Sequence, residues 1–467
     1  MKLNKFLSFF LITAFVIPLL FSCNAENSNI TEDSGFLSSS ETPSSSLGSE
    51  ESTEESVQSQ IQNEIPNESS EIEEEIIIPQ DSVVSFFACP DNLIHPSLYY
   101  NAIEKAAVKN GVQPDYSDLH NAEYDFSPMY EYIKNEIVQA DIAYINQESL
   151  IGGDCKPISA YPQFNTPVPM AKTLADLGFD IVNVAHNHML DSGDTRYLEY
   201  CSSLFEGLGV NVLGYYPNEK STDDIMIIEK NGIKIAFLTY TYGTNGIRVP
   251  SKSDVVVPYF DDALIEHQVE IAKANADVII ASCHWGNEYQ YNPNSMQKQY
   301  AKKLCELGVD IILGMHPHCI QPVEWMTSES GSKTLVVYSL GTMISGIRKG
   351  MSALAGILSL EIRKDGETGE ISIESPLFIP TVAHYERGRS IASNDTGSRE
   401  FTIYYLADYT QELAKKHGII RAEQKDGTTL VGGGFSLETL FATIEKYIDP
   451  EFLPQDFKEK QSELTEN

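Results

Sequence analysis

The sequence predicts an α/β domain with mixed sheets, joined to a helical C-terminal appendage. From residue 81 onward, short apolar runs rich in Val, Ile, Phe and Tyr alternate with amphipathic stretches. In those stretches apolar residues recur at positions i, i+3 and i+4, which is the spacing of one helix face. Strands that alternate with helices are typical of sheets buried beneath helices.

The predicted strands are ten apolar runs at 82–88, 141–146, 180–185, 209–213, 224–229, 233–240, 277–283, 309–314, 334–340 and 355–362. The predicted helices between them are 127–139, 168–177, 194–207, 261–274 and 294–307. Gly178, Gly207 and Gly308 stand at the ends of three of these helices, where a C-terminal cap favours glycine. The pattern therefore predicts one core domain over residues 81–385.

Two pairs of predicted strands have no helix between them, so we expect each pair to be antiparallel. The pairs are 224–229 with 233–240, and 334–340 with 355–362. Lys230-Asn231-Gly232 supplies an Asn-Gly turn to the first pair, which is a strong hairpin signal. After residue 385 the pattern becomes helical, in 399–416 and 436–446, and predicts a C-terminal extension over 386–467.

The first 23 residues are predicted to be a lipoprotein signal peptide. Lys2 and Lys5 precede an apolar run from Phe6 to Phe21, which is too short to span a bilayer comfortably. The run ends in Leu-Phe-Ser before Cys23, which resembles a bacterial lipobox, where the Cys is lipidated and becomes the mature N-terminus. An ordinary signal peptide with a chance Cys, or an uncleaved anchor, is the alternative. The expected location is the outer face of the cell membrane, held by a lipid on Cys23.

Residues 24–80 are predicted to be a disordered tether. They contain 14 Asp and Glu and no Lys or Arg, so they offer too little apolar surface to offset the entropy of ordering. The net charge of the chain is −35; without the +2 of the leader and the −14 of the tether, residues 81–467 carry −23. A domain this acidic is a poor candidate for binding nucleic acid. It does not exclude anionic substrates, because a bound metal ion reverses the local sign.

Cysteine usage indicates mostly free thiols. Apart from Cys23 the chain has six, which are scattered and include no C-x-x-C pair: Cys89, Cys155, Cys201, Cys283, Cys305 and Cys319. Several lie in apolar runs, where a Cys behaves as a small buried hydrophobic residue.

Polar clusters follow five of the predicted strands, at the carboxyl ends where the functional loops of α/β proteins lie. They are the segments 89–95, 146–148, 186–191, 284–288 and 316–318, and they hold six of the ten His in the chain. A lone His at a strand end is more often a core residue than a ligand, but this concentration exceeds what solvation or turn formation needs. Imidazole and carboxylate together bind Zn, Mn and Fe, and a shared carboxylate can hold two ions about 4 Å apart.

The order of these motifs resembles that of the calcineurin-like metallophosphoesterase superfamily. It runs Asp, Asn-x-Glu, Asn-His, a single His and then His-x-His. More closely, the sequence resembles the CapA family of poly-γ-glutamate capsule proteins. The matching segments are DNLIH at 91–95, NQESLIGG at 146–153, YPQFNTP at 161–167, NVAHNHMLDSG at 183–193, SCHWGNEY at 282–289, GMHPHCIQPVEW at 314–325 and VYSLGT at 337–342. The resemblance covers about residues 82–345 and implies a metallophosphoesterase-like αββα sandwich.

The resemblance also implies a role for each matching residue. The residues that match metal ligands are Asp91, Glu148, Asn187, His284, His316 and His318, with Glu148 as the shared carboxylate. His188 matches the residue that protonates the leaving oxygen as a general acid, or that stabilises the transition state. The residues expected to orient these groups are Asn146, Asp191, Glu288 and His95. The implied cofactors are one or two divalent ions, Mn, Fe or Zn.

Three residues depart from the family's pattern. Pro90 replaces the usual Gly before Asp91, His186 stands where many members have Asn, and Thr342 replaces an Asn. The spacing from Asp91 to His95 is wider than the usual phosphoesterase motif, which leaves open whether one or two ions bind.

Three functions are consistent with these observations. The first is a surface enzyme that hydrolyses a phosphoester, or a related ester or amide, in the handling of polyglutamate or a cell-wall polymer. The second is a non-catalytic component of a capsule synthesis and export complex, which binds the anionic polymer through its metal site. The third is a secreted domain whose histidines are structural, which leaves their strand-end order unexplained. The expected partners are an anionic polymer such as poly-γ-glutamate, membrane synthase or export proteins, and the membrane itself through the lipid.

Overall fold

A computed structural model describes residues 80–387, 399–420 and 430–466. The predicted leader at 1–23, its Cys23, and all but the last residue of the predicted tether at 24–80 lie outside the described residues. Within the described ranges, no helix is long and apolar enough to cross a membrane.

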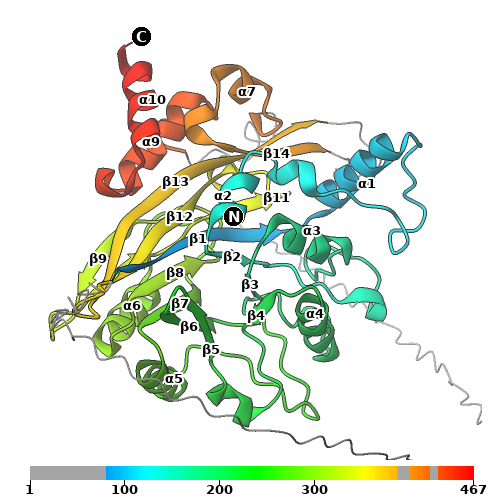
Figure 1. The fold of residues 1–467 in the computed structure, drawn as a ribbon. Helices are drawn as coiled ribbons and strands as arrows, with labels where there is room; N and C mark the ends of the chain where they lie inside the picture. The colour runs from blue at the N-terminus through cyan, green and yellow to red at the C-terminus, as the bar shows by residue number, and fades with distance from the viewer. Residues whose placement is uncertain (1–79, 388–398, 421–429, 467) are drawn as a thin grey trace, which may run out of the picture. The chain divides into compact units, whose positions relative to one another are not determined.

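The described strands form two sheets (Figure 1). The first has the order β14 (Arg399–Tyr405), β13 (Ile371–Arg387), β12 (Leu354–Lys364), β1 (Ser82–Leu93), β2 (Ile142–Asn146), β3 (Ile181–Asn183) and β4 (Asn211–Leu213), with β11 (Thr342–Ser345) also paired to β1. The second has the order β5 (Met226–Lys230), β6 (Ile233–Thr241), β7 (Val278–His284), β8 (Ile311–Met315), β10 (Lys333–Val337) and β9 (Val323–Thr327). Both sheets contain parallel and antiparallel pairs, so the predicted mixed sheets are confirmed.

The helices of the described residues are α1 (Pro96–Asn110), α2 (Lys134–Gln139), α3 (Pro169–Leu177), α4 (Arg196–Gly207), α5 (Asp262–Asn275), α6 (Ser295–Leu307), α7 (Gln411–Lys416), α9 (Leu437–Tyr447) and α10 (Gln455–Glu466). Local sequence fixes several of their ends. Asn294 and Gln297 form a capping box at the start of α6, and Gly308 ends that helix with φ of 89°. Gly178 ends α3 in the same way, as predicted, whereas the predicted cap at Gly207 is wrong, because Gly207 is the last residue of α4 and Leu208 is its C-cap.

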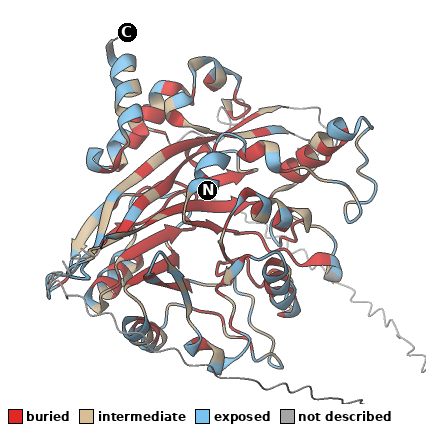
Figure 2. Ribbon diagram, in the orientation of Figure 1, coloured by how far each residue is buried: buried red, intermediate tan, exposed pale blue. Residues whose placement is uncertain are grey.

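Alternation of side chains along the strands divides the core into two layers. On β6, Ile233, Ile235 and Phe237 belong to the large core that contains residues of both sheets. Ala236, Leu238 and Tyr240 point the other way, into a second core shared with α5 and α6. Figure 2 shows the buried residues running along the strands, with the outer faces of the helices exposed.

Direct contacts join the facing sheets. The ring of Phe86 on β1 lies 6.1 Å from that of Phe237 on β6. The hydroxyl of Tyr144 on β2 lies 2.7 Å from that of Ser282 on β7. Since α5 and α6 cover one sheet and α4 packs on β4 of the other, the predicted αββα sandwich is confirmed.

The hairpin between β5 and β6 is confirmed. Asn231 and Gly232 form its two-residue turn with φ of 50° and 77°, the left-handed conformation that such a turn requires. The thiols of Cys89, Cys201, Cys283, Cys305 and Cys319 are buried and free, as predicted.

The predicted pairing of 334–340 with 355–362 is wrong. β10 lies in the six-stranded sheet beside β8 and β9, whereas β12 lies in the eight-stranded sheet between β1 and β13. The chain crosses from one sheet to the other through β11, which pairs in parallel with β1. Adjacency in sequence without a helix therefore did not imply pairing.

The predicted helix over 399–416 is wrong in its first half. Residues 399–405 form β14, which pairs antiparallel with β13. This pairing joins the predicted extension after residue 385 to a strand of the predicted core domain. Phe401 and Ile403 alternate inward at strand spacing, and aromatic and β-branched residues favour an extended chain. The second half forms α7, and the predicted helix over 436–446 is confirmed as α9.

Candidate metal centre

The predicted ligands meet at the carboxyl ends of strands from both sheets. Asp91 belongs to β1, and Glu148 and Asn187 lie just past β2 and β3. His284 ends β7, and His316 and His318 follow β8. Each of these six residues is buried, with at most 3% of its surface exposed.

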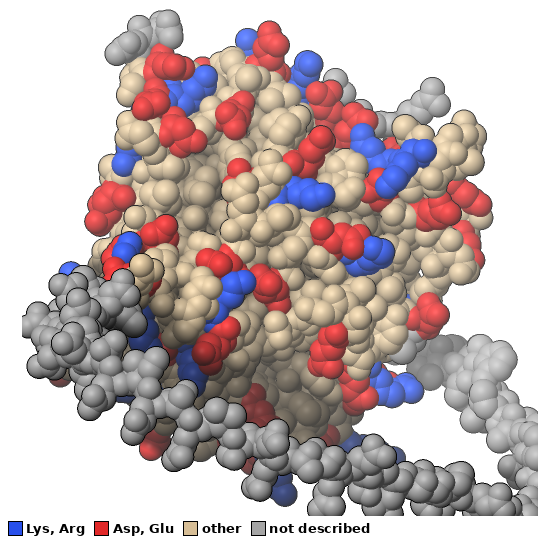
Figure 3. Space-filling view, viewed as in Figure 1, with Lys and Arg blue, Asp and Glu red and all other residues tan. Residues whose placement is uncertain are grey.

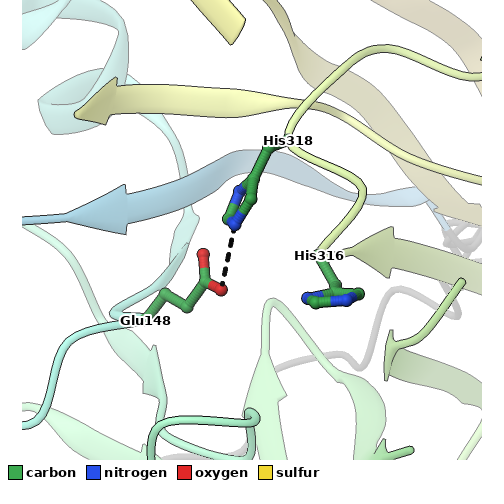
Figure 4. Close-up of side chains that lie close together, drawn as sticks. All are labelled: Glu148, His316 and His318. Atoms are coloured by element: carbon green, nitrogen blue, oxygen red, sulfur yellow. Dashed lines mark ion pairs between the residues drawn. The ribbon is translucent and has the colours of Figure 1, made fainter. Parts of the chain in front are cut away.

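Glu148 lies at the centre of the group. Its Oε1 is 3.5 Å from His284 Nε2 and 3.6 Å from His318 Nε2. The ligand atoms of Glu148, His316 and His318 all lie within 4.8 Å of one another. In Figure 4 the imidazole of His318 points toward the carboxylate of Glu148, and the His316 ring lies to the right of that carboxylate. No group of the described chain donates a hydrogen bond to either carboxylate oxygen.

Asp91 is held by the strands beneath the site. Its Oδ1 accepts a hydrogen bond from Asn146 Nδ2 at 2.8 Å, and its Oδ2 accepts one from the backbone N–H of His316 at 3.1 Å. The same Oδ2 lies 3.3 Å from His318 Nδ1. Asp91 therefore positions both histidines of the His-x-His motif.

A chain of polar side chains continues from Asp91 across both sheets. Asn146 Oδ1 accepts a hydrogen bond from Asn183 Nδ2 at 2.8 Å, and Asn183 Oδ1 accepts one from the Thr239 hydroxyl at 2.9 Å. Asn183 and Thr239 are fully buried and were not predicted. Their only sequence signal is a polar residue inside an apolar strand, which does not reveal its partner.

Asn187 contacts the imidazole of His284. Asn187 Oδ1 lies 2.9 Å from His284 Nε2, and Asn187 Nδ2 donates to Asn245 Oδ1 at 3.3 Å. Asn245 was not predicted, because it lies in a loop after β6 away from the strand-end motifs. Its Nδ2 is also 3.3 Å from His188 Nδ1.

The imidazole of His188 is oriented by Asp191. His188 Nδ1 lies 2.7 Å from Asp191 Oδ2, and this oxygen also accepts the backbone N–H of Phe164 at 2.7 Å. A carboxylate at that distance favours the tautomer with the proton on Nδ1, which leaves Nε2 available for proton exchange.

Three further positions near these histidines differ in their contacts. His95 packs edge-on against Phe164, which packs against His188, so His95 reaches the site through an aromatic ring. Glu288 is exposed, and among the described residues it forms no hydrogen bond with an imidazole. His186 Nδ1 accepts the backbone N–H of His188 at 3.1 Å. The roles of His95 and Glu288 stay predictions.

Burial sets the electrostatics of the group. Burial raises the pKa of Glu148 well above its usual value, and the charges of Asp91 and Glu288 raise it further. Burial lowers the pKa of His284 and His316 well below the usual value, and neighbouring imidazoles add to the shift. Neutral imidazole is the form that binds a metal ion, and a cation among these groups would stabilise ionised Glu148.

Unpartnered buried atoms show that the group suits a divalent ion. Both oxygens of Glu148 and the Nδ1 atoms of His284 and His316 have no hydrogen-bond partner in the described chain. Buried polar atoms without partners are costly and rare. Carboxylate and imidazole are ligands of Zn, Mn and Fe, so the residues present fit such an ion.

The backbone is strained where it forms this group. His316 has φ of 95° and His318 has φ of 52°, which a non-glycine residue adopts at a cost. Gly314, just before them, has no room for a side chain, because a Cβ there would lie 2.0 Å from the Tyr338 carbonyl oxygen. Strain of this kind clusters at functional sites, where it aims side chains.

Two packed mixed sheets with a buried imidazole–carboxylate group at their carboxyl ends define an α/β protein with a candidate divalent-metal site. Residues 85–347, more than half of the chain, match the profile of the bacterial capsule synthesis protein PGA_cap, and the chain belongs to this family. The resemblance predicted from the motifs is confirmed.

Relatives and solved structures are similar over part of the chain. Residue identity is 28% over 204 residues with the PGA biosynthesis protein CapA of Bacillus subtilis (strain 168), covering 43% of this chain and 52% of that protein. It is 28% over 177 residues with the capsule biosynthesis protein CapA of Bacillus anthracis, covering 37% and 42%. The match thus spans about half the length of these relatives.

Among solved structures, a 5'-nucleotidase precursor from Thermus thermophilus is 14% identical, with a TM-score of 0.38 over 64% of this chain and 55% of that chain. A phosphatase from Mycoplasma pneumoniae is 14% identical, with a TM-score of 0.35 over 64% and 94%.

Proposed function

We propose that this protein is a metal-dependent hydrolase that acts in the synthesis or export of a poly-γ-glutamate capsule or a similar cell-surface polymer. Membership of the capsule synthesis family supports the pathway. The names of the two CapA relatives, one of which is a PGA biosynthesis protein, support the polymer. The observation that carries the chemistry is Glu148, a fully buried carboxylate that faces two imidazoles and has no hydrogen-bond partner in the described chain.

The metal would be held by six residues in two overlapping sets. One set is Asp91, Glu148 and His318, which are in mutual contact. The other is Glu148, His284 and Asn187, and His316 is within reach of the same carboxylate. A divalent ion bound there supplies Lewis-acid chemistry for hydrolysis of an ester or amide bond.

His188 is the residue proposed to move a proton. Asp191 holds the Nδ1 proton of His188, so Nε2 can carry the proton that a leaving oxygen needs. Asn245 contacts both His188 and Asn187 and thereby fixes the proton donor relative to the metal ligands.

Tyr242 packs against two of the predicted ligands. Its ring packs against His316 with ring centres 4.6 Å apart and lies nearly parallel to His284 at 6.3 Å. The residue is 38% exposed, whereas both imidazoles are buried, so its ring covers part of the group.

Metal analysis combined with turnover tests the proposal. The full-length protein is purified from membranes, its Mn, Fe and Zn content is measured, and hydrolysis of bis-p-nitrophenyl phosphate and of poly-γ-glutamate is assayed. We expect bound metal and turnover in the wild type. We expect His188→Ala to keep its metal and lose at least about 100-fold in rate, the scale of general acid catalysis. His267→Ala, the same change at a half-exposed surface histidine, is the control.

The outcomes separate the enzyme from the alternative. Bound metal without turnover of either substrate would overturn the hydrolase and leave a non-catalytic component that binds polymer. A protein without metal would overturn both.

We further propose that the protein is anchored by a lipid on Cys23 at the outer face of the membrane. The tether over 24–80 would then hold the folded domain away from the bilayer. Cys23→Ser tests this by fractionation of cells: the variant should leave the membrane fraction. Retention of the variant in membranes would support an uncleaved apolar anchor instead.

A further inference from the structure

An exposed ammonium group lies at the edge of the metal centre. Lys349 Nζ is 3.9 Å from the centre of the Tyr289 ring. The Tyr289 ring is 6.0 Å from the ring of His318. The ammonium therefore lies within about 10 Å of a predicted metal ligand.

Backbone hydrogen bonds connect the segments of Tyr289 and Lys349 to segments of the metal centre. Tyr289 donates its backbone N–H to the carbonyl of Pro317, between the two histidines, at 2.7 Å. The loop that carries Lys349 follows β11, and its Gly346 N–H lies 3.2 Å from His95 Nδ1. The Lys349 carbonyl accepts the N–H of Ser352 at 3.0 Å. The backbone that carries Tyr289 and Lys349 is thus held by segments next to the predicted ligands.

Lys349 differs from many lysines of the domain. Lys105, Lys109, Lys172, Lys303 and Lys364 each form an ion pair with a carboxylate. Lys349 is exposed, and within the described chain no carboxylate lies at ion-pair distance from it; its partner is an aromatic face. A cation on an aromatic face keeps its charge available to a further anion.

The surroundings make this charge significant. On the face shown in Figure 3, acidic residues are spread over the surface, and basic residues stand singly or in small groups among them. Asp91, Glu148 and Glu288 lie in or beside the site. An anionic chain that approaches meets repulsion unless a cation offsets it.

We propose that Lys349, supported by Tyr289, binds a carboxylate of an anionic polymer while a neighbouring unit of the same chain occupies the metal centre. This inference rests on the proposed function and narrows its substrate to polymers that carry a carboxylate on successive units, such as poly-γ-glutamate. The metal centre would bind the unit that reacts, and Lys349 would favour polymers that carry carboxylates.

The test is the affinity for fluorescently labelled poly-γ-glutamate, measured by anisotropy on the full-length, Mn-loaded protein. We expect Lys349→Gln to weaken binding about five- to tenfold, as for one charge-assisted contact at an exposed site. Lys349→Arg should stay within about twofold, because it keeps the charge. The loss in Lys349→Gln should shrink at high salt.

The matched control is Lys333→Gln. Lys333 is also exposed and begins β10, at the end of the sheet opposite the site. The Lys333→Gln variant should bind the polymer with the affinity of the wild type. Equal binding by wild type and Lys349→Gln, or equal weakening in both variants, overturns the inference.

The same protein samples keep the two proposals separate. Lys349→Gln should retain the metal content of the wild type, because Lys349 is not a predicted metal ligand, and the rate of the wild type on bis-p-nitrophenyl phosphate reports the proposed function on its own. If wild type holds metal and hydrolyses that substrate while Lys349→Gln binds polymer normally, only the role of Lys349 fails. If wild type holds no metal, the proposed function fails.

Discussion

The chain buries two groups of histidines, and their neighbours differ. His284, His316 and His318 surround Glu148 at the carboxyl ends of strands. In the second group, His384 on β13 lies near His417 after α7, with ring centres 5.0 Å apart. The first group includes a buried carboxylate, whereas the second is built from imidazole and phenol rings.

The nitrogens of the second group are mostly satisfied. His384 Nδ1 lies 2.6 Å from the Tyr409 hydroxyl. His417 Nε2 lies 3.1 Å from the Ala383 carbonyl, and its Nδ1 accepts the backbone N–H of Ile419 at 3.0 Å. These bonds fix the tautomer of the His417 ring and hold the segment after α7 against β13.

The comparison teaches which feature identifies a metal site. Burial lowers the pKa of His384 to about 4, and it also lowers the pKa of His284 and His316. Burial and a shifted pKa are therefore common to both groups. The buried, unpartnered carboxylate of Glu148 is the feature that distinguishes the first group and favours a cation.

The largest effect is expected from Glu148→Gln, which keeps the shape and removes the charge. Metal affinity should fall at least about 100-fold, since loss of a mere supporting contact already costs about 10–100-fold. Competition with a chelator measures it. Glu386→Gln, beside His384, is the matched control and should bind metal normally. Unchanged affinity in Glu148→Gln would place the ion elsewhere.

In the metal-free protein, we expect Glu148→Gln to cause no loss of stability. Glu148 is a buried carboxyl that no described group hydrogen-bonds, so Gln should not lower the free energy of unfolding when metal is absent. Urea unfolding in the presence of a chelator checks this.

The next largest effect is expected in the second histidine group, that of His384 and His417. His417→Ala should lower the free energy of unfolding by about 2–4 kcal/mol, because it leaves a cavity and removes two hydrogen bonds. The ring packs against Phe435 and Tyr385 at 4.4 and 4.7 Å. Urea unfolding gives the change, and metal content should equal that of the wild type. Loss of metal would show that the two groups are coupled.

The strand-end residues of the first group could be predicted because each motif is local. Asp91, Glu148 and His284 each follow or end an apolar run, and strands of parallel sheets bring such ends together. Asn183, Thr239 and Asn245 could not be predicted, because their roles depend on which side chain faces them across the sheets. The same limit explains the wrong pairing of 334–340, since sheet membership is set by long-range packing.

A smaller effect is expected from Asp191→Asn. The amide no longer favours the Nδ1 proton of His188, so turnover of bis-p-nitrophenyl phosphate should fall about 10–100-fold while metal content stays unchanged. Tyr409→Phe removes the partner of a histidine in the second group. It should leave turnover unchanged and cost about 1 kcal/mol of stability. Equal rates in Asp191→Asn and wild type would contradict the role of His188.

The smallest effect is a difference in pH dependence. The pKa of His384 is about 4 in the folded chain and 6.5 as its ordinary value. Above pH 6.5 the residue is neutral in both states and adds nothing. As the pH falls from 6.5 to 4 the unfolded chain binds the proton first, so this residue lowers the free energy of unfolding. His384→Gln should remove about 1–2 kcal/mol of that loss, measured as the difference between variant and wild type in metal-free protein at about pH 7 and about pH 4.5.

The raised pKa of Glu148 acts with the opposite sign, because the folded chain holds that proton more tightly. The contribution of Glu148 to the free energy of unfolding is present below pH 4.5 and is lost as the pH rises. Glu148→Gln should therefore make the free energy of unfolding fall more steeply as the pH is lowered. Slopes that change in the same direction in the two variants would contradict the distinction between the two groups.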